Sequence, residues 1–159
     1  MATGNHRASR IPASESATVL CVSPFEGDHV FLEQAFRNST LKVQAVRSSR
    51  EALDVMSSSM VAVVLCEESL PDGDWKGMLA DVVSMPDGPV LIVTSRLADD
   101  ILWAEVLSMG AYDLLMKPFD ATEVFRVVSL AWRHWKENWE KARAGYQALG
   151  TAAARANPV

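Results

Sequence analysis

The sequence has few of the features that would place the chain in a membrane, outside the cell or around a metal. Its 159 residues include only two cysteines, Cys21 and Cys66, and both fall in stretches predicted to be buried strands. Two thiols are too few for a zinc site or a disulfide framework. No apolar run approaches the roughly 20 residues that span a bilayer. Residues 1–17 lack the apolar core of a signal peptide. We therefore expect a cytoplasmic protein without a membrane span.

Basic charge is also scarce in the body of the chain. Residues 18–120 hold 16 acidic and 7 basic residues, a net charge of −9, whereas residues 121–159 carry +3. An acidic body with a mildly basic tail argues against a nucleic-acid-binding module. The three histidines, His6, His29 and His134, are far apart in the sequence and form no evident catalytic or metal-binding group.

Short apolar runs alternate with helical patterns along most of the chain. The runs begin at Thr18, Leu41, Val61, Val90 and Leu114, and each is followed by an amphipathic or capped segment. This order predicts one α/β domain with a parallel sheet and helices on both faces. Residues 1–17 show no periodicity and are predicted to be a disordered leader.

The stretch Val61–Trp75 combines a buried strand with acidic residues at its end. Its apolar run, Val61–Cys66, is typical of a strand buried on both faces, and Glu67 and Glu68 follow it directly. In a parallel sheet the carboxyl ends of the strands meet at one rim, where such folds place their sites. At the other strand ends, that rim would carry Ser23-Pro24, Thr94 and Lys117.

These residues, at this spacing, resemble the receiver domains of two-component response regulators. The resemblance covers residues 18–132 and depends on motifs that are strong only together: Glu67-x-x-Leu70-Pro71 with Gly73, Thr94-Ser95, Gly110-Ala111 and Lys117-Pro118-Phe119. It implies a flavodoxin-like (βα)5 fold, a doubly wound parallel five-stranded sheet with strand order 2-1-3-4-5. No catalytic activity of its own is expected.

The resemblance also implies a chemistry. A histidine kinase donates a phosphoryl group to an aspartate after the third strand, an acidic pair after the first strand holds Mg²⁺, and Thr94 and Lys117-Pro118 match the remaining phosphate site. Here the phosphoacceptor position is Glu67, one methylene longer, and the acidic pair is replaced by Ser23-Pro24. We therefore expect no cofactor and at most weak Mg²⁺ binding. Leu114 stands where the family usually has a switch aromatic. We read Asp28 as a helix cap and Glu26 as a surface acid.

Three interpretations of Glu67 stay open. The side chain can be an inert relic, it can pair with Lys117 in place of a phosphoryl-aspartate, or it can still accept phosphate. A lysine–carboxylate pair at a partly buried rim needs no metal, and we favour that interpretation.

The last helix, from Ala121 to about Leu149, is longer than the domain requires. Its apolar residues alternate in steps of four and three, which is the spacing of a coiled-coil seam. Trp132, Trp135, Trp139 and Tyr146 are the large residues of that seam. We predict that residues 133–150 form a helical extension that projects beyond the domain and pairs two copies, and that residues 151–159 form a flexible tail. Two alternatives stay open: the helix can fold back on its own domain, or it can dock on another protein.

The sequence thus predicts a stand-alone degenerate receiver that acts through protein–protein contacts in two-component signalling, with a signalling protein or histidine kinase as partner. A switchable receiver with the same fold is the first alternative. A flavodoxin-like ligand binder or enzyme is the second, although no glycine-rich phosphate loop follows the first strand.

Overall fold

The structure is a computed structural model that describes residues 18–156. Five parallel strands form one sheet in the order β2-β1-β3-β6-β7. These strands are β1 (Thr18–Val22), β2 (Lys42–Val46), β3 (Val61–Glu67), β6 (Val90–Ser95) and β7 (Asp113–Met116). The expected fold class and strand order are confirmed. A two-stranded antiparallel pair, β4 (Ser69–Leu70) and β5 (Gly73–Asp74), lies between β3 and the next helix.

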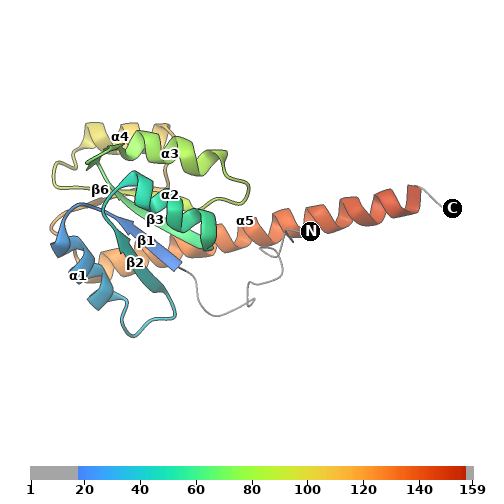
Figure 1. Ribbon diagram of the computed structural model, residues 1–159, viewed down its shortest axis with the longest axis horizontal. Helices are drawn as coiled ribbons and strands as arrows, with labels where there is room; N and C mark the ends of the chain where they lie inside the picture. Colours follow the sequence, from blue (N-terminus) through green and yellow to red (C-terminus); the bar gives the residue numbers. More distant parts are fainter. Residues whose placement is uncertain (1–17, 157–159) are drawn as a thin grey trace.

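Helices cover both faces of the sheet (Figure 1). On one face lie α2 (Ser49–Ser58), α3 (Trp75–Ser84) and α4 (Asp100–Ser108), and on the other lie α1 (Glu26–Ala35) and α5 (Ala121–Ala156). β3 is buried along its whole length, as its apolar run predicts, and its residues contribute to both core clusters. The sheet therefore separates two apolar layers, and its strand ends are fixed by packing on both sides.

Side-chain caps define where several helices begin. Ser48, Asp74 and Asp99 each accept a hydrogen bond from a backbone N–H in the first turn of α2, α3 and α4. Asp120 does the same for α5, where its Oδ1 accepts from the Glu123 N–H at 3.0 Å. These caps satisfy donors that the helix itself leaves unpaired.

α1 differs from the prediction at its start. The helix begins at Glu26, its N-cap residue Phe25 makes no side-chain cap, and Asp28 lies inside the first turn. Asp28 is therefore not the helix cap that the sequence suggested, and its carboxylate is available for another contact.

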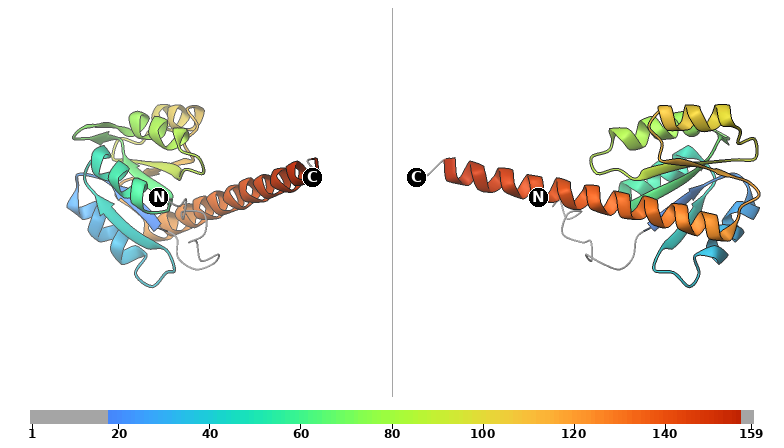
Figure 2. Two further views of the ribbon diagram at one scale, coloured as in Figure 1. Left: turned by 45° about the vertical axis from the view of Figure 1, so that its right-hand side comes forward. Right: turned by 180° about the vertical axis from the view of Figure 1, so that it is seen from behind.

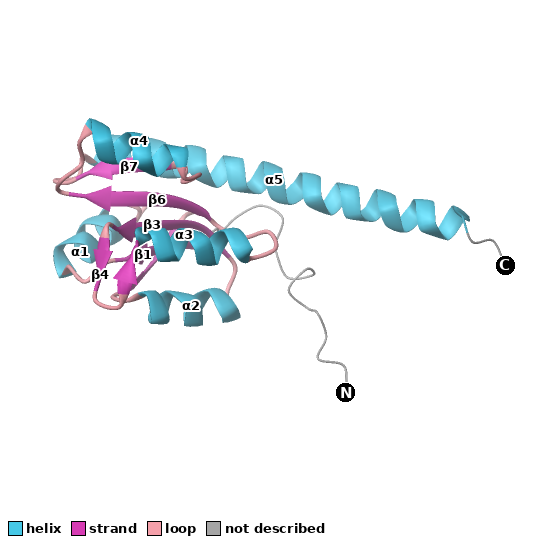
Figure 3. Ribbon diagram, turned by 90° about the horizontal axis from the view of Figure 1, so that it is seen from above, coloured by secondary structure: helices cyan, strands magenta, loops and turns pink. Residues whose placement is uncertain are grey.

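α5 is the longest element and passes well beyond the domain (Figures 1 and 2). Seen from above, its far end has no other helix or strand beside it (Figure 3). The helix reaches Ala156, so it continues through most of the segment that the sequence assigned to a flexible tail. The predicted leader, residues 1–17, and the last residues, 157–159, lie outside the described part of the chain. Within that part, no helix is long and apolar enough to cross a bilayer.

Candidate functional site

The polar strand ends meet at one rim of the sheet, as expected. Glu67 and Thr94 are register partners on β3 and β6, and the backbone N–H of Lys117, just after β7, donates to the Ser95 carbonyl at 3.0 Å. Ser23 follows β1, and its N–H donates to the Val46 carbonyl at 3.0 Å. Backbone pairing thus holds all four positions close together.

Lys117 is at the centre of a buried charge cluster. Its Nζ lies 2.6 Å from Glu67 Oε2 and 2.7 Å from Asp28 Oδ2. The three side chains are between 4% and 10% exposed. The expected pair between Glu67 and Lys117 is therefore present, and a second carboxylate shares the same ammonium.

Two hydroxyl groups complete the hydrogen bonding of this cluster. Thr94 Oγ1 donates to Glu67 Oε2 at 2.9 Å, and Ser23 Oγ donates to Asp28 Oδ2 at 2.6 Å. Across the described residues, no buried side-chain nitrogen or oxygen lacks a partner. Each carboxylate thus receives one neutral donor and one shared cationic donor, which offsets the cost of burying it.

Asp28 is the site residue that sequence reasoning missed. Its carboxylate lies in the first turn of α1, where the unpaired N–H groups of a helix favour a negative charge. The available signal was its position, the sixth residue after the first strand, on the face of the helix that turns toward the rim. The sequence did not separate this position from a cap, because the helix begins three residues earlier than a cap at Asp28 would require.

His29 was also missed. The sequence placed it at a helix start with no role, but it is 7% exposed and its Nε2 lies 2.7 Å from the Ser23 carbonyl oxygen. Because a carbonyl oxygen only accepts, Nε2 is the donor in this contact. His29 therefore fixes the turn that carries Ser23.

The residues after Ser23 cover the cluster rather than enter it. The Pro24 carbonyl accepts from Arg47 Nη1 at 3.1 Å, and Glu26 pairs with the same arginine at the surface, as expected for a solvated acid. The Phe25 ring lies 4.7 Å from Lys117 Nζ, and the Arg96 guanidinium lies 5.7 Å from that ring. An aromatic ring thus stands between Lys117 and solvent.

The other predicted rim residues are placed as follows. Glu68 does not join the cluster, and its Oε2 accepts from Ser95 Oγ at 2.6 Å. Leu114, at the switch position, is 9% exposed and packs in the core layer beneath α4. Lys117 and Pro118 are joined by a cis peptide bond.

The donor set at the rim does not fit Mg²⁺, the ion that the receiver chemistry requires. Mg²⁺ takes carboxylate and water oxygens in near-octahedral geometry. Here the carboxylate oxygens Asp28 Oδ2 and Glu67 Oε2 are both bonded to the Lys117 ammonium. Between residues 18 and 156, no three metal-binding side chains of the His, Cys, Asp and Glu types are grouped to hold an ion.

The tryptophans of α5 correct a second prediction. We expected the helix to leave the domain at Trp132, but Trp135 is 6% exposed, and Trp132 and Trp139 pack partly against the same core layer. The Trp135 and Trp139 rings lie 6.2 Å apart, and Trp135 Nε1 donates to the Asp87 carbonyl at 3.4 Å. These indoles therefore cover the domain's own surface. Tyr146, in contrast, is 80% exposed.

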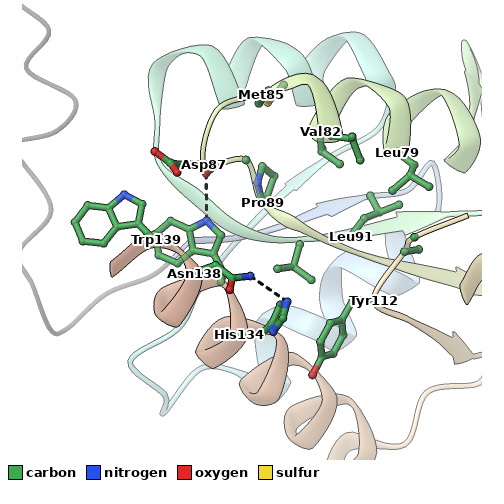
Figure 4. A pocket seen from close by; sticks show the side chains of 16 residues that line it. Leu79, Val82, Met85, Asp87, Pro89, Leu91, Tyr112, His134, Asn138 and Trp139 are labelled. Atoms are coloured by element: carbon green, nitrogen blue, oxygen red, sulfur yellow. Dashed lines mark hydrogen bonds between the residues drawn. The ribbon is translucent and has the colours of Figure 1, made fainter. Parts of the chain in front are cut away.

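A cavity of about 480 Å³ lies beside these tryptophans, between α3, α5 and the loops before β6 and β7. Figure 4 shows Leu79 and Val82 along one side and His134, Asn138 and Trp139 along the other. The cavity is bordered by residues at the amino ends of β6 and β7, and the charge cluster lies at the carboxyl ends of the strands. It is a separate feature from the rim.

Comparison with known proteins gives a consistent picture. Residues 28–129 match the family model of the response regulator receiver domain. The chain is similar to the DNA-binding transcriptional regulator NtrC of Klebsiella pneumoniae, at 29% identity over 71% of this chain and 24% of that protein. It therefore spans about a quarter of that relative's length.

Solved structures show the same fold. The signal receiver domain of a LuxO repressor protein from Vibrio parahaemolyticus superposes with a TM-score of 0.72, at 20% identity, over 77% of this chain and 95% of that one. A receiver domain described as BeF3-activated DrrB gives 0.66, at 16% identity, over 74% and 96%. At these sequence identities, the structural similarity shows only that the fold is the same.

Proposed function

This chain belongs to the response regulator receiver family, and from that premise we propose that it is a degenerate receiver whose phosphate site is filled by its own side chains. A receiver signals by changing its contacts, and this one would act as a protein–protein interaction module without aspartyl phosphorylation. The observation that carries the proposal is the position of Glu67 Oε2, which binds both Thr94 Oγ1 and Lys117 Nζ.

Thr94 and Lys117 are the residues that would bind phosphoryl oxygens in the family's chemistry. Phosphoryl transfer depends mainly on positioning and on neutralising charge. Because the Glu67 carboxylate already takes the hydroxyl and the ammonium, an incoming phosphoryl group would have to displace it. Asp28 strengthens the arrangement, since it holds the same ammonium from the opposite element, α1.

The replacement of the metal-binding acidic pair by Ser23-Pro24 supports the same proposal. Without Mg²⁺, the negative charges of a phosphoryl group would face Asp28 and Glu67 directly. The cluster already carries two carboxylates against one ammonium, so a further anion is disfavoured. We therefore expect the rim to hold one conformation, with partners recognising that fixed surface. A histidine kinase or another signalling protein is the partner class implied by the family.

A titration with beryllofluoride and Mg²⁺ tests this proposal, with amide NMR shifts of Glu67, Thr94 and Lys117 as the readout. The proposal predicts no saturable shift at these three amides. The DrrB receiver, whose structure is described as BeF3-activated, is the positive control under the same conditions. Saturable shifts confined to the rim would contradict the proposal and favour a switchable receiver.

The proposal includes a second copy of the chain as partner of the α5 extension. Residues 140–150 are all exposed, and Ala142, Tyr146 and Leu149 continue the heptad spacing beyond Trp139. An isolated helix as short as residues 140–150 is only marginally stable in water. An apolar seam along it therefore favours pairing with a second helix. The expected interface is this short seam, without the buried tryptophans.

Sedimentation velocity over a concentration series tests the pairing. Tyr146→Glu places a charge on the seam and should shift the protein to monomer. Ala144→Glu is the matched control, because residue 144 lies on the opposite side of the helix, roughly 180° from Trp135 at 3.6 residues per turn. If the two variants sediment alike at every concentration, the seam does not hold the dimer.

A further inference from the structure

The free part of α5 has an apolar stripe that nothing else in the described chain covers. Tyr146 is 80% exposed and Leu149 is 72% exposed, and the helix projects clear of the domain in every view (Figures 1–3). Gly145 and Gly150 lie beside the stripe, and each costs about 1 kcal/mol of helix stability relative to alanine. Burial of the stripe against a partner would offset this cost.

The stripe points in the same direction as Trp135. At 3.6 residues per turn, Trp139, Ala142, Tyr146 and Leu149 lie within roughly 40° of Trp135 around the helix axis. Trp135 faces the domain, because it is buried and its indole N–H reaches the Asp87 carbonyl. The domain and the free stripe are therefore on one side of α5, the domain before Trp139 and the stripe after it.

This geometry restricts how a second α5 can bind. In a parallel pair, the partner helix would lie along the stripe, and its residues before 139 would continue along the same side of α5. The first domain already fills that space, so the two would clash. An antiparallel partner runs the other way, with its tip toward Trp139 and its domain beyond the first helix's end. Resting on the pairing proposed above, we infer that two copies associate through residues 139–156 of α5 in antiparallel orientation, related by a twofold axis.

The spacing of the stripe supports a second copy over a foreign helix. In an antiparallel pair centred between residues 147 and 148, Tyr146 lies opposite Leu149 of the partner subunit, and position 142 lies opposite position 153. Both contacts occur twice, which is the self-complementarity that a twofold interface requires. Gly145 and Gly150 flank the central layers, and small flanking residues let the two helix axes approach closely.

Charge favours the same orientation. Residues 140–156 contain Lys141, Arg143 and Arg155 against Glu140, a net charge of +2, whereas residues 18–120 carry −9. Antiparallel pairing brings the basic helix end of one copy to the acidic domain of the other, near Asp87 and the cavity beside Trp139 (Figure 4). It also keeps the two acidic domains at opposite ends, which lowers their mutual repulsion.

Disulfide trapping in the full chain tests the orientation. Single variants Ala142→Cys and Ala153→Cys are prepared, and each is oxidised alone and in an equal mixture. Oxidised glutathione accepts the two electrons and two protons released as the sulfur–sulfur bond forms. The native thiols are 2% and 0% exposed, so the wild-type chain is the control for unwanted cross-links. Tryptic digestion without reduction, followed by mass spectrometry, identifies which positions each disulfide joins, because cleavage after Arg143 places residues 142 and 153 in different peptides.

The mixture should yield a 142–153 disulfide in excess over either homodimer. In the antiparallel pair, two copies of residue 142 are separated by eleven residues along the axis, about 17 Å, too far for a disulfide. Homodimers of Ala142→Cys, with dimeric sedimentation retained, would overturn the orientation and leave the pairing intact. A monomer, or a dimer with no cross-link in any sample, would overturn the seam itself. None of these outcomes bears on the rim, which the beryllofluoride titration tests separately.

Discussion

Among single residues, Lys117 matters most, because its ammonium is shared by two carboxylates. Breaking a buried ion pair by removing one partner is costly because it leaves uncompensated charge. The Lys117 side chain is only 4% exposed. If it is replaced, water can therefore do little to compensate the charges of the Asp28 and Glu67 carboxylates that remain. Lys117→Met should lower the free energy of unfolding by about 3–5 kcal/mol, measured by urea denaturation.

The same pair should show strong coupling. Glu67→Gln in the Lys117→Met background should cost much less than in the wild type, because the contact is already lost and one of two adjacent negative charges is removed. A double-mutant cycle gives the coupling directly. Independent, additive effects of the two substitutions would show that Glu67 and Lys117 contribute separately.

The buried thiols make stability sensitive to alkaline pH. Burial, with a contribution from Asp28, raises the pKa of Cys21 from 9.0 to about 12, and burial likewise raises the pKa of Cys66. The unfolded chain therefore loses thiol protons above pH 9 while the folded chain keeps them. Stability from this source is complete below pH 9 and falls as pH rises toward 12, by about 1.4 kcal/mol per pH unit for each thiol.

Urea midpoints between pH 8.5 and 10.5 check this dependence. Cys21→Ala combined with Cys66→Ala is the matched variant, because its other titrating groups are unchanged. The variant should lose stability less steeply than the wild type. Parallel slopes would assign the alkaline loss to the lysines and tyrosines that both proteins share.

Among the elements, α5 has two parts: its first part packs against the domain, and its far end is exposed to solvent. Trp135 is 6% exposed and Tyr146 is 80% exposed, although both occupy seam positions of the same helix. Trp135→Ala should cost about 3–5 kcal/mol, as large-to-small changes in a core do. Tyr146→Ala should leave the urea midpoint of dilute protein within error of the wild type. Comparable losses in the two variants would show that the far end of α5 also folds against the domain.

Elements also show where sequence reasoning succeeds. The five strands and the rim positions of Glu67, Thr94 and Lys117 follow from apolar runs and from the geometry of parallel sheets, whereas the strand order follows from the resemblance to receiver domains. Asp28 could not be assigned to the rim because its role depends on a three-residue difference in where α1 begins. The tryptophans were misplaced because heptad spacing identifies an apolar stripe but gives no information about what covers it.

At the scale of the whole molecule, the chain carries two distinct surfaces. The rim at the carboxyl ends of the strands holds a charge cluster in which every buried polar group is paired. The α5 extension leaves the domain at the opposite edge, near the amino ends of the strands. Signalling through fixed contacts requires no change at the rim. Dimerisation through the extension would then present two identical rims at the ends of an elongated particle.

If the rim does not accept a phosphoryl group, incubation with acetyl phosphate and Mg²⁺ should leave the chain unmodified, and intact-protein mass spectrometry measures this. We expect a mass identical to that of the untreated chain, whereas a receiver with an aspartate at the phosphoacceptor position should gain one phosphoryl group in a parallel reaction. A gain of one phosphoryl group that maps to Glu67 would contradict the account.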